Sequence, residues 1–532
     1  MVLRLVTGGD AGEAEQDRAE ALVARLKTLG QAPSGGHGGA VGLPPGPALG
    51  SKAMTTEIGT LWGAALLRDV HFADWAGHPA AVAVSQAVAS LPSRPGPRAI
   101  PDRGEIPFAD ATLGAGQGPY VSQFLLVGTG ARPAARGWAD GGSVGTGGAQ
   151  DDGPGAGIVR YGAQCLHQRI TGYLARLDHG TDWTGRRAAA GAILGPAAFE
   201  CHPRFVATPR DLASFVDLGA PHQAFLTALH LILDAGTPLD GGLSLAGDAV
   251  GPADIEALVL GAAARAVDVL PRLPDDGRAT PSELAAGLAL ARAGDQGRRL
   301  GERREAFAAM AAALEPSGLP ERIAAHNAYQ NRLWSPRDGR GDLGPLAPED
   351  NVLLPLATTR DAPDRGTRLA HAAAAGACAT VLKACFEMFE PDPVTGRPRA
   401  RPLTGAGAML PCAYEADPDD PTHLRPVAGA ALSLQGEIDK LAANLAAARC
   451  FAGQAAPSET RAALRLGERL AVAMLRDRLG GAPAAMRFTS FDGDHLTIAA
   501  TPGTEGARVL VRDAAGHGGS AETLQAWWTR QD

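Results

Sequence analysis

The sequence of 532 residues contains very little lysine, which occurs only at Lys27, Lys52, Lys383 and Lys440. Acidic residues outnumber basic ones by 57 to 49, which gives a formal net charge of -8. Because nucleic acids and anionic bilayers bind basic surfaces, this balance argues against both as main partners. No run of 18 apolar residues occurs, so no helix is expected to span a membrane.

Signatures of metal sites and of export are also missing. The six cysteines form no CxxC pair, and none has histidines at zinc-finger spacing. Cys378 and Cys385 lie seven residues apart on a predicted helix, which favours buried, reduced thiols. The N-terminal apolar run is too short for a signal peptide, so we expect a cytoplasmic protein.

What the sequence does contain is helical periodicity. Apolar residues recur at the spacing of one helix face from Ser51 onward, which predicts a mainly α protein of packed bundles. One β-hairpin is predicted near the C-terminus, in the stretch MRFTSFDGDHLTIAA, with Asp492 and Gly493 in its turn. The predicted helices cover residues 161–177, 210–236, 254–270, 281–294, 302–318, 371–389, 434–452 and 459–478.

Eight segments, in order and spacing over about residues 51–500, resemble the bacterial branch of the vanadium-dependent haloperoxidases. That family shares its fold with the type 2 phosphatidic acid phosphatases. The resemblance implies two packed four-helix bundles, usually in a homodimer. The segments are TEIGTLWGAALLRDVHFADW, GPYVSQFLL, YGAQCLHQRITGYLARLD, RDLASFVDLGAPHQAFLTALHLILDAGTPLD, AGACATVLKACFE, GEIDKLAANLAAARCFAG, RLGERLAVAMLRD and FDGDHLTI.

This resemblance divides the chain into four parts. Residues 1–50 are expected to form an arm and a Gly/Pro-rich linker. The first helical bundle is expected over 51–245, including a mobile Gly-rich loop at 128–157. The second bundle, with the vanadate-type pocket, is expected over 246–505, and 506–532 form a tail.

In the family, vanadate oxygens are bound by a lysine, two arginines and a Ser-Gly pair. One histidine binds vanadium at the apex, and a second acts as acid and base. A buried oxyanion needs several fixed donors because it has lost its hydration. The last segment of the family places the apical histidine six residues after an arginine. Here Arg449 matches the arginine, but Ala455 stands at the place of the histidine.

The remaining positions match only in part. His371 matches the acid–base histidine, whereas Leu369 and Ala370 replace the Ser-Gly pair. A Cβ at the glycine position would crowd the approach of the backbone amide to the oxyanion. In the first segment, Arg272 is placed on the lysine, with Arg278 nearby.

Each of these residues also has a plain structural interpretation. His371 could be a histidine at a helix start that is hydrogen-bonded to a carbonyl. Arg449 could cap the end of its helix through the last carbonyl groups. Arg272 could be an exposed arginine that pairs with Asp275 or Asp276.

The leading hypothesis is therefore a haloperoxidase homologue that has lost vanadate binding and peroxidase activity, acting as a pseudoenzyme, scaffold or partner subunit. No cofactor is expected, except vanadate if the site still functions. The alternative is an active haloperoxidase, a phosphatase-like enzyme or a metal-free enzyme that uses a rearranged pocket around His371, Arg449 and Arg272. A homodimer is expected from the resemblance, and a protein partner is open.

Overall fold

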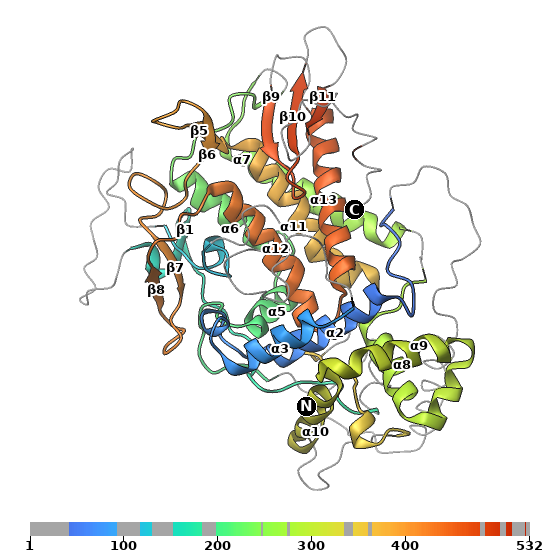
Figure 1. The fold of residues 1–532 in the computed structure, drawn as a ribbon. Coiled ribbons are helices and arrows are strands. Elements are labelled where there is room, and N and C mark those ends of the chain that lie inside the picture. Colours follow the sequence, from blue (N-terminus) through green and yellow to red (C-terminus); the bar gives the residue numbers. More distant parts are fainter. Residues whose placement is uncertain are drawn as a thin grey trace, which may run out of the picture.

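The structure, a computed structural model, is mainly helical, as predicted (Figure 1). Its strands form only short antiparallel pairs and one three-stranded sheet within the described residues. No helix in this part of the chain is both long and apolar enough to cross a bilayer. The described residues are 42–92, 118–129, 153–183, 198–245, 248–273, 277–334, 344–359, 364–478, 485–500, 507–512 and 527.

Eleven α-helices lie in these ranges, and three of them lie where the sequence predicts the longest helices. They are α11 (Arg365–Cys385), α12 (Leu434–Phe451) and α13 (Pro457–Arg478). The others are α2 (Lys52–Leu66), α3 (Pro79–Ala89), α5 (Pro209–Leu218), α6 (Gln223–Asp234), α7 (Pro252–Val269), α8 (Pro281–Arg292), α9 (Arg304–Leu314) and α10 (Leu319–Trp334).

The helices pack around two hydrophobic cores. The larger core joins α5, α6 and α7 to α11, α12 and α13, which run together through the centre of the molecule (Figure 1). The smaller core joins α2 to α8, α9 and α10. α2 serves both, because Ala64 and Leu67 face the larger core while Ile58 and Trp62 face the smaller one. Both cores draw helices from both sides of residue 245, where the bundle boundary is predicted.

Two glycines bring α11 and α13 into backbone contact. A Cβ on Gly376 of α11 would overlap the carbonyl oxygen of Leu464 on α13. In return, a Cβ on Gly467 of α13 would overlap the carbonyl oxygen of Ala373 on α11. The two helices therefore cross at a distance that only residues without a side chain allow.

A fully buried lysine links the three central helices. Lys383 Nζ on α11 lies 2.9 Å from Asp439 Oδ1 on α12 and 3.7 Å from Glu468 Oε1 on α13. It donates to the carbonyl oxygen of Thr489 at 2.8 Å and lies 4.1 Å from the ring centre of Phe491. One ammonium thus faces two carboxylates, and burial raises the pKa of Glu468 to about 7 despite the charge of Lys383.

The predicted C-terminal hairpin is present as β9 (Ala485–Thr489) and β10 (His495–Ala500). Gly493 has a φ of +85° in the connection, which suits glycine. A third strand, β11 (Ala507–Arg512), extends the sheet on the other side of β10. This sheet closes one end of the larger core, because Met486, Phe488 and Ile498 are buried there.

Three predictions about strands and helices are wrong. The helix predicted over 210–236 is two helices, α5 and α6, which are separated between Leu218 and Gln223. Residues 161–177 are not helical, because Gly162 (φ +57°) turns the chain between β1 (Ile158–Tyr161) and β2 (Gln164–His167). The C-terminal hairpin is also not the only one. Three further pairs are β3 (Ser244–Leu245) with β4 (Asp248–Ala249), β5 (Phe389–Pro391) with β6 (Pro398–Ala400), and β7 (Ala413–Ala416) with β8 (Leu424–Val427).

Three expected segments fall largely outside the described residues. They are the arm at 1–50, most of the loop at 128–157, and the tail at 506–532 apart from β11 and a buried Trp527. The prediction of reduced cysteines is confirmed. All six are free, and Cys378 and Cys385 are buried on α11, where burial raises the pKa of both thiols.

We predict that Gly376→Ala destabilises the protein by about 1–3 kcal/mol, because the added methyl group forces two helix backbones apart. Gly261→Ala is the matched control, since a Cβ at this position of α7 meets nothing within 4 Å. The control should be neutral or stabilising by up to about 1 kcal/mol, the difference in helix propensity. Urea unfolding measures both, and equal effects would rule out close packing at Gly376.

We also predict that Glu468→Gln flattens the fall of stability between about pH 4.5 and 7. The pKa of Glu468 is raised by burial from 4.5 to about 7, so the folded state holds its proton more tightly than the unfolded state does. The resulting stability is present at low pH and is lost as the pH rises through 7. Urea unfolding at pH 5.5, 7 and 8.5 should show this loss, mostly between pH 5.5 and 7, in the wild type and in the exposed control Glu302→Gln. The loss should be smaller in Glu468→Gln, where only Asp439, whose burial raises its pKa to about 6, still contributes.

Candidate functional site

The predicted site residues other than Arg272 lie where four helix ends meet. His371 stands in the second turn of α11, and Arg449 in the last turn of α12. Ala455 lies in the short link between α12 and α13, and Asp217 near the end of α5. The structure therefore brings together residues that are up to 238 positions apart in the sequence.

The link between α12 and α13 is a tight turn built on a glycine. Gly453 has a φ of +80°, and a Cβ there would lie 2.6 Å from the carbonyl oxygen of Pro355. The amides of Gln454 and Ala455 both donate to the carbonyl oxygen of Arg449, at 2.9 and 3.2 Å. This turn places the methyl group of Ala455 in the interior, with 0% of the residue exposed.

Arg449 is buried and paired with protein groups. Its Nη1 donates to Asp217 Oδ1 at 2.8 Å and to the side-chain oxygen of Gln454. Gln454 in turn donates to Thr358 Oγ1 at 2.9 Å, and Tyr173 donates its hydroxyl proton to Asp217 Oδ2 at 2.6 Å. The charge of Arg449 is thus already compensated by a carboxylate whose orientation is fixed from a second side.

His371 is neutral at physiological pH. Its Nε2 lies 3.2 Å from the carbonyl oxygen of Gly219, which makes Nε2 the donor and leaves the proton there. Burial first, and then the nearby charge of Arg449, lower the pKa of His371 to about 3, although the bond to Gly219 works against this. His371 thus makes the hydrogen bond to a carbonyl group that a purely structural role predicts.

Arg272 lies apart from these groups. Its side chain is exposed, and Nη1 donates to the carbonyl oxygen of Asp268 one turn earlier at 2.8 Å. No hydrogen bond or ion pair within the described residues links it to His371 or Arg449. The neighbouring Arg278 lies close enough to α2 for its charge to act on the buried Glu57.

Sequence analysis missed a second buried ion pair next to the site. Arg368 Nη2, one turn before His371 on α11, lies 2.9 Å from Glu459 Oε1 on α13. Glu57 accepts the amide proton of Ser458 at 2.7 Å, so its carboxyl group caps the start of α13. The spacing of Arg368 and His371 was visible in the sequence, but no spacing could reveal Asp217, Glu459 or Glu57.

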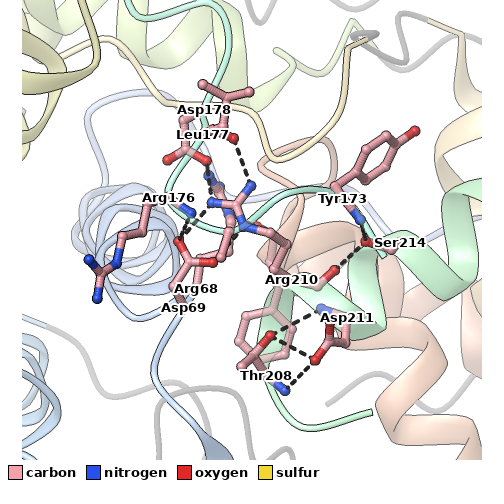
Figure 2. A network of polar contacts seen from close by, with 12 residues as sticks. Arg68, Asp69, Tyr173, Arg176, Leu177, Asp178, Thr208, Arg210, Asp211 and Ser214 are labelled. Atoms are coloured by element: carbon pink, nitrogen blue, oxygen red, sulfur yellow. Dashed lines mark hydrogen bonds and ion pairs between the residues drawn. The ribbon is translucent and has the colours of Figure 1, made fainter. Parts of the chain in front are cut away.

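A cluster of buried charged side chains contacts the turn that carries Ala455. Asp178 Oδ1 lies 2.6 Å from Arg68 Nη1 and 2.8 Å from Arg210 Nη2 (Figure 2). Although burial alone would raise it, these two charges hold the pKa of Asp178 well below its usual range. Arg68 also donates to the carbonyl oxygens of Phe451, at the end of α12, and of Pro355, which faces Gly453. The turn that carries Ala455 is therefore fixed by this cluster.

Comparisons by sequence and by structure both find vanadium-dependent bromoperoxidases, although no family model matches the chain. Vanadium-dependent bromoperoxidases of Corallina pilulifera and Corallina officinalis are each 26% identical to it, over 497 and 495 residues. Both alignments cover 86% of this chain and 76% of the relative. This chain is a homologue of the vanadium-dependent bromoperoxidases.

The fold agrees with this relationship. The second vanadate-dependent bromoperoxidase of Ascophyllum nodosum, a homohexamer, superposes with a TM-score of 0.61 at 15% identity. The alignment covers 95% of this chain and 83% of that one. The chain thus has the vanadium haloperoxidase fold, whereas its placement in the bacterial branch stays a prediction.

The residues at this site of the haloperoxidase fold do not fit vanadate. Ala455 offers a methyl group where the resemblance places the ligand to the metal, and Arg449 already binds Asp217. Arg272 points its charge into solvent rather than toward these residues. Within the described residues, no group of three or more histidine, cysteine, aspartate or glutamate side chains could hold a metal ion either.

We predict that the ring of His371 does not titrate between pH 5 and 8, because burial and Arg449 lower its pKa to about 3. The ¹³Cε1 signal of histidine-labelled protein, assigned by its loss in His371→Gln, should stay constant over this range. The control is the protein unfolded in urea, in which histidine titrates near pH 6.5. A midpoint near 6 in the folded protein would mean that the imidazole is hydrated and free to exchange protons.

Proposed function

We propose that this chain is a vanadium haloperoxidase homologue that binds no vanadate and has no peroxidase activity, and that it serves as a scaffold or partner subunit. The observation that carries the proposal is the buried methyl group of Ala455 at the place of the apical histidine. A methyl group has no lone pair for vanadium and no nitrogen to accept a phosphoryl group. The one replacement therefore removes both chemistries that the resemblance implies.

The charges around Ala455 support the same proposal. A bound oxyanion needs positive groups whose charge is not already satisfied. Here Arg449 contacts Asp217 at 2.8 Å, and Arg368 contacts Glu459 at 2.9 Å. His371, with a pKa of about 3, has no imidazolium form at neutral pH with which to protonate a substrate.

The setting of the protein is part of the proposal. We propose a cytoplasmic homo-oligomer that acts through a protein partner rather than through nucleic acid or a membrane. The homohexamer of the Ascophyllum nodosum bromoperoxidase supports an oligomer, while the dimer rests on the family resemblance. The net charge of -8 supports the exclusion of nucleic acid.

The alternative is an enzyme that uses a rearranged pocket around His371, Arg449 and Arg272. It requires Arg272 to approach the other two residues, but Arg272 is exposed and bonded within its own helical turn. It also requires Arg449 to release Asp217 when substrate binds. Both requirements make the non-catalytic function the better supported of the two.

We predict that the wild-type protein shows no saturable binding of orthovanadate in calorimetry and no peroxide-dependent oxidation of bromide above buffer. Ala455→His supplies the missing ligand and tests whether that residue alone separates the chain from its relatives. Because Arg449 remains paired, we expect this variant to bind weakly or not at all.

Micromolar binding of orthovanadate by the wild type, together with bromide oxidation, would show that the chain is an active haloperoxidase and would overturn the proposal. Tight binding by Ala455→His alone would leave the proposal standing. It would also identify one histidine as the whole difference from the active relatives.

A further inference from the structure

We propose that Asp217 and Glu459 are internal counter-ions that take the place of the oxyanion and so exclude anions from this site. The proposal deepens the proposed function and rests on it. It names two residues that determine specificity, beyond the missing ligand at Ala455. The ligand class concerned is a tetrahedral oxyanion, such as orthovanadate or phosphate.

The Arg449–Asp217 pair has the geometry of a bound anion. The carboxylate lies 2.8 Å from the guanidinium, the distance of a charge-assisted hydrogen bond. Its second oxygen accepts the hydroxyl proton of Tyr173 at 2.6 Å, so the carboxylate cannot turn away without losing a bond. The side chain of Asp217 is 19% exposed, so the carboxylate itself is partly in contact with solvent.

The Arg368–Glu459 pair repeats this arrangement one turn before His371 on α11. The two side chains are 7% and 3% exposed and lie 2.9 Å apart. Glu459 belongs to the first turn of α13, where the amide groups also favour a negative charge. An anion would therefore have to displace Glu459 from both the arginine and the helix start.

The sum of charges decides against any further anion. Two buried arginines face two carboxylates, so these two pairs leave no positive charge over, and Arg278 faces the buried carboxyl group of Glu57. In contrast, Arg449 Nε and His371 Nδ1 are buried and have no hydrogen-bond partner within the described chain. Removing one carboxylate would leave a buried cation with an unused donor, which is the arrangement that binds an anion.

The test compares anion binding by four proteins: the wild type, Asp217→Asn, Glu459→Gln and Asp268→Asn. The last is the matched control, because it removes the same charge at an exposed position on α7. Calorimetry with orthovanadate and, separately, with phosphate at low ionic strength gives the dissociation constants. We expect at least tenfold tighter binding of both anions by Asp217→Asn than by Asp268→Asn, and a smaller gain for Glu459→Gln.

Each outcome separates this proposal from the proposed function. If the wild type binds weakly and neither Asp217→Asn nor Glu459→Gln binds more tightly than Asp268→Asn, the counter-ion proposal is overturned while the proposed function stands. If the wild type itself binds orthovanadate tightly, the proposed function fails first. Should Asp217→Asn not fold, Glu459→Gln tests the same proposal at the second pair, with circular dichroism and thermal unfolding as the check on folding.

Discussion

The carboxylate of Asp178, bound between Arg68 and Arg210, is the interaction on which the site depends (Figure 2). Its second oxygen accepts from His326 of α10 at 2.8 Å, so the cluster joins a helix of the smaller core to α5 of the larger one. Arg68 then extends the cluster to the carbonyl oxygen of Phe451. Buried charges are tolerated only when every partner is present, which makes this junction sensitive to any single substitution.

Much of the fold could be predicted from the sequence because long helices carry a strong periodic signal. The helices α11, α12 and α13 begin and end within a few residues of the prediction, apart from the first turns of α11. Residues 161–177 could not be predicted, since their apolar spacing suits a helix while the turn at Gly162 and the contacts of the folded chain decide otherwise. In this segment the contacts of the folded chain, and not the local apolar spacing, determine the secondary structure.

The candidate site was predictable only where the resemblance supplied positions. His371, Arg449 and Ala455 do come together, because the helices that carry them keep the haloperoxidase arrangement. The compensating carboxylates at Asp217 and Glu459 could not be predicted, because ion pairing between distant helices leaves no periodicity or spacing in the sequence. Arg272 was chosen from alignment alone, and the structure leaves it in solvent.

The mutual contact at Gly376 and Gly467 has a consequence for the candidate site at the ends of these helices. The distance between α11 and α13 is set by backbone atoms in the middle of both helices, where no side chain acts as a spacer. Side chains at the site end of the two helices can therefore be exchanged without changing the distance between the helices. The spacing of α11 and α13 is therefore independent of the residues at the candidate site. The identity of those few residues decides whether the site binds a ligand.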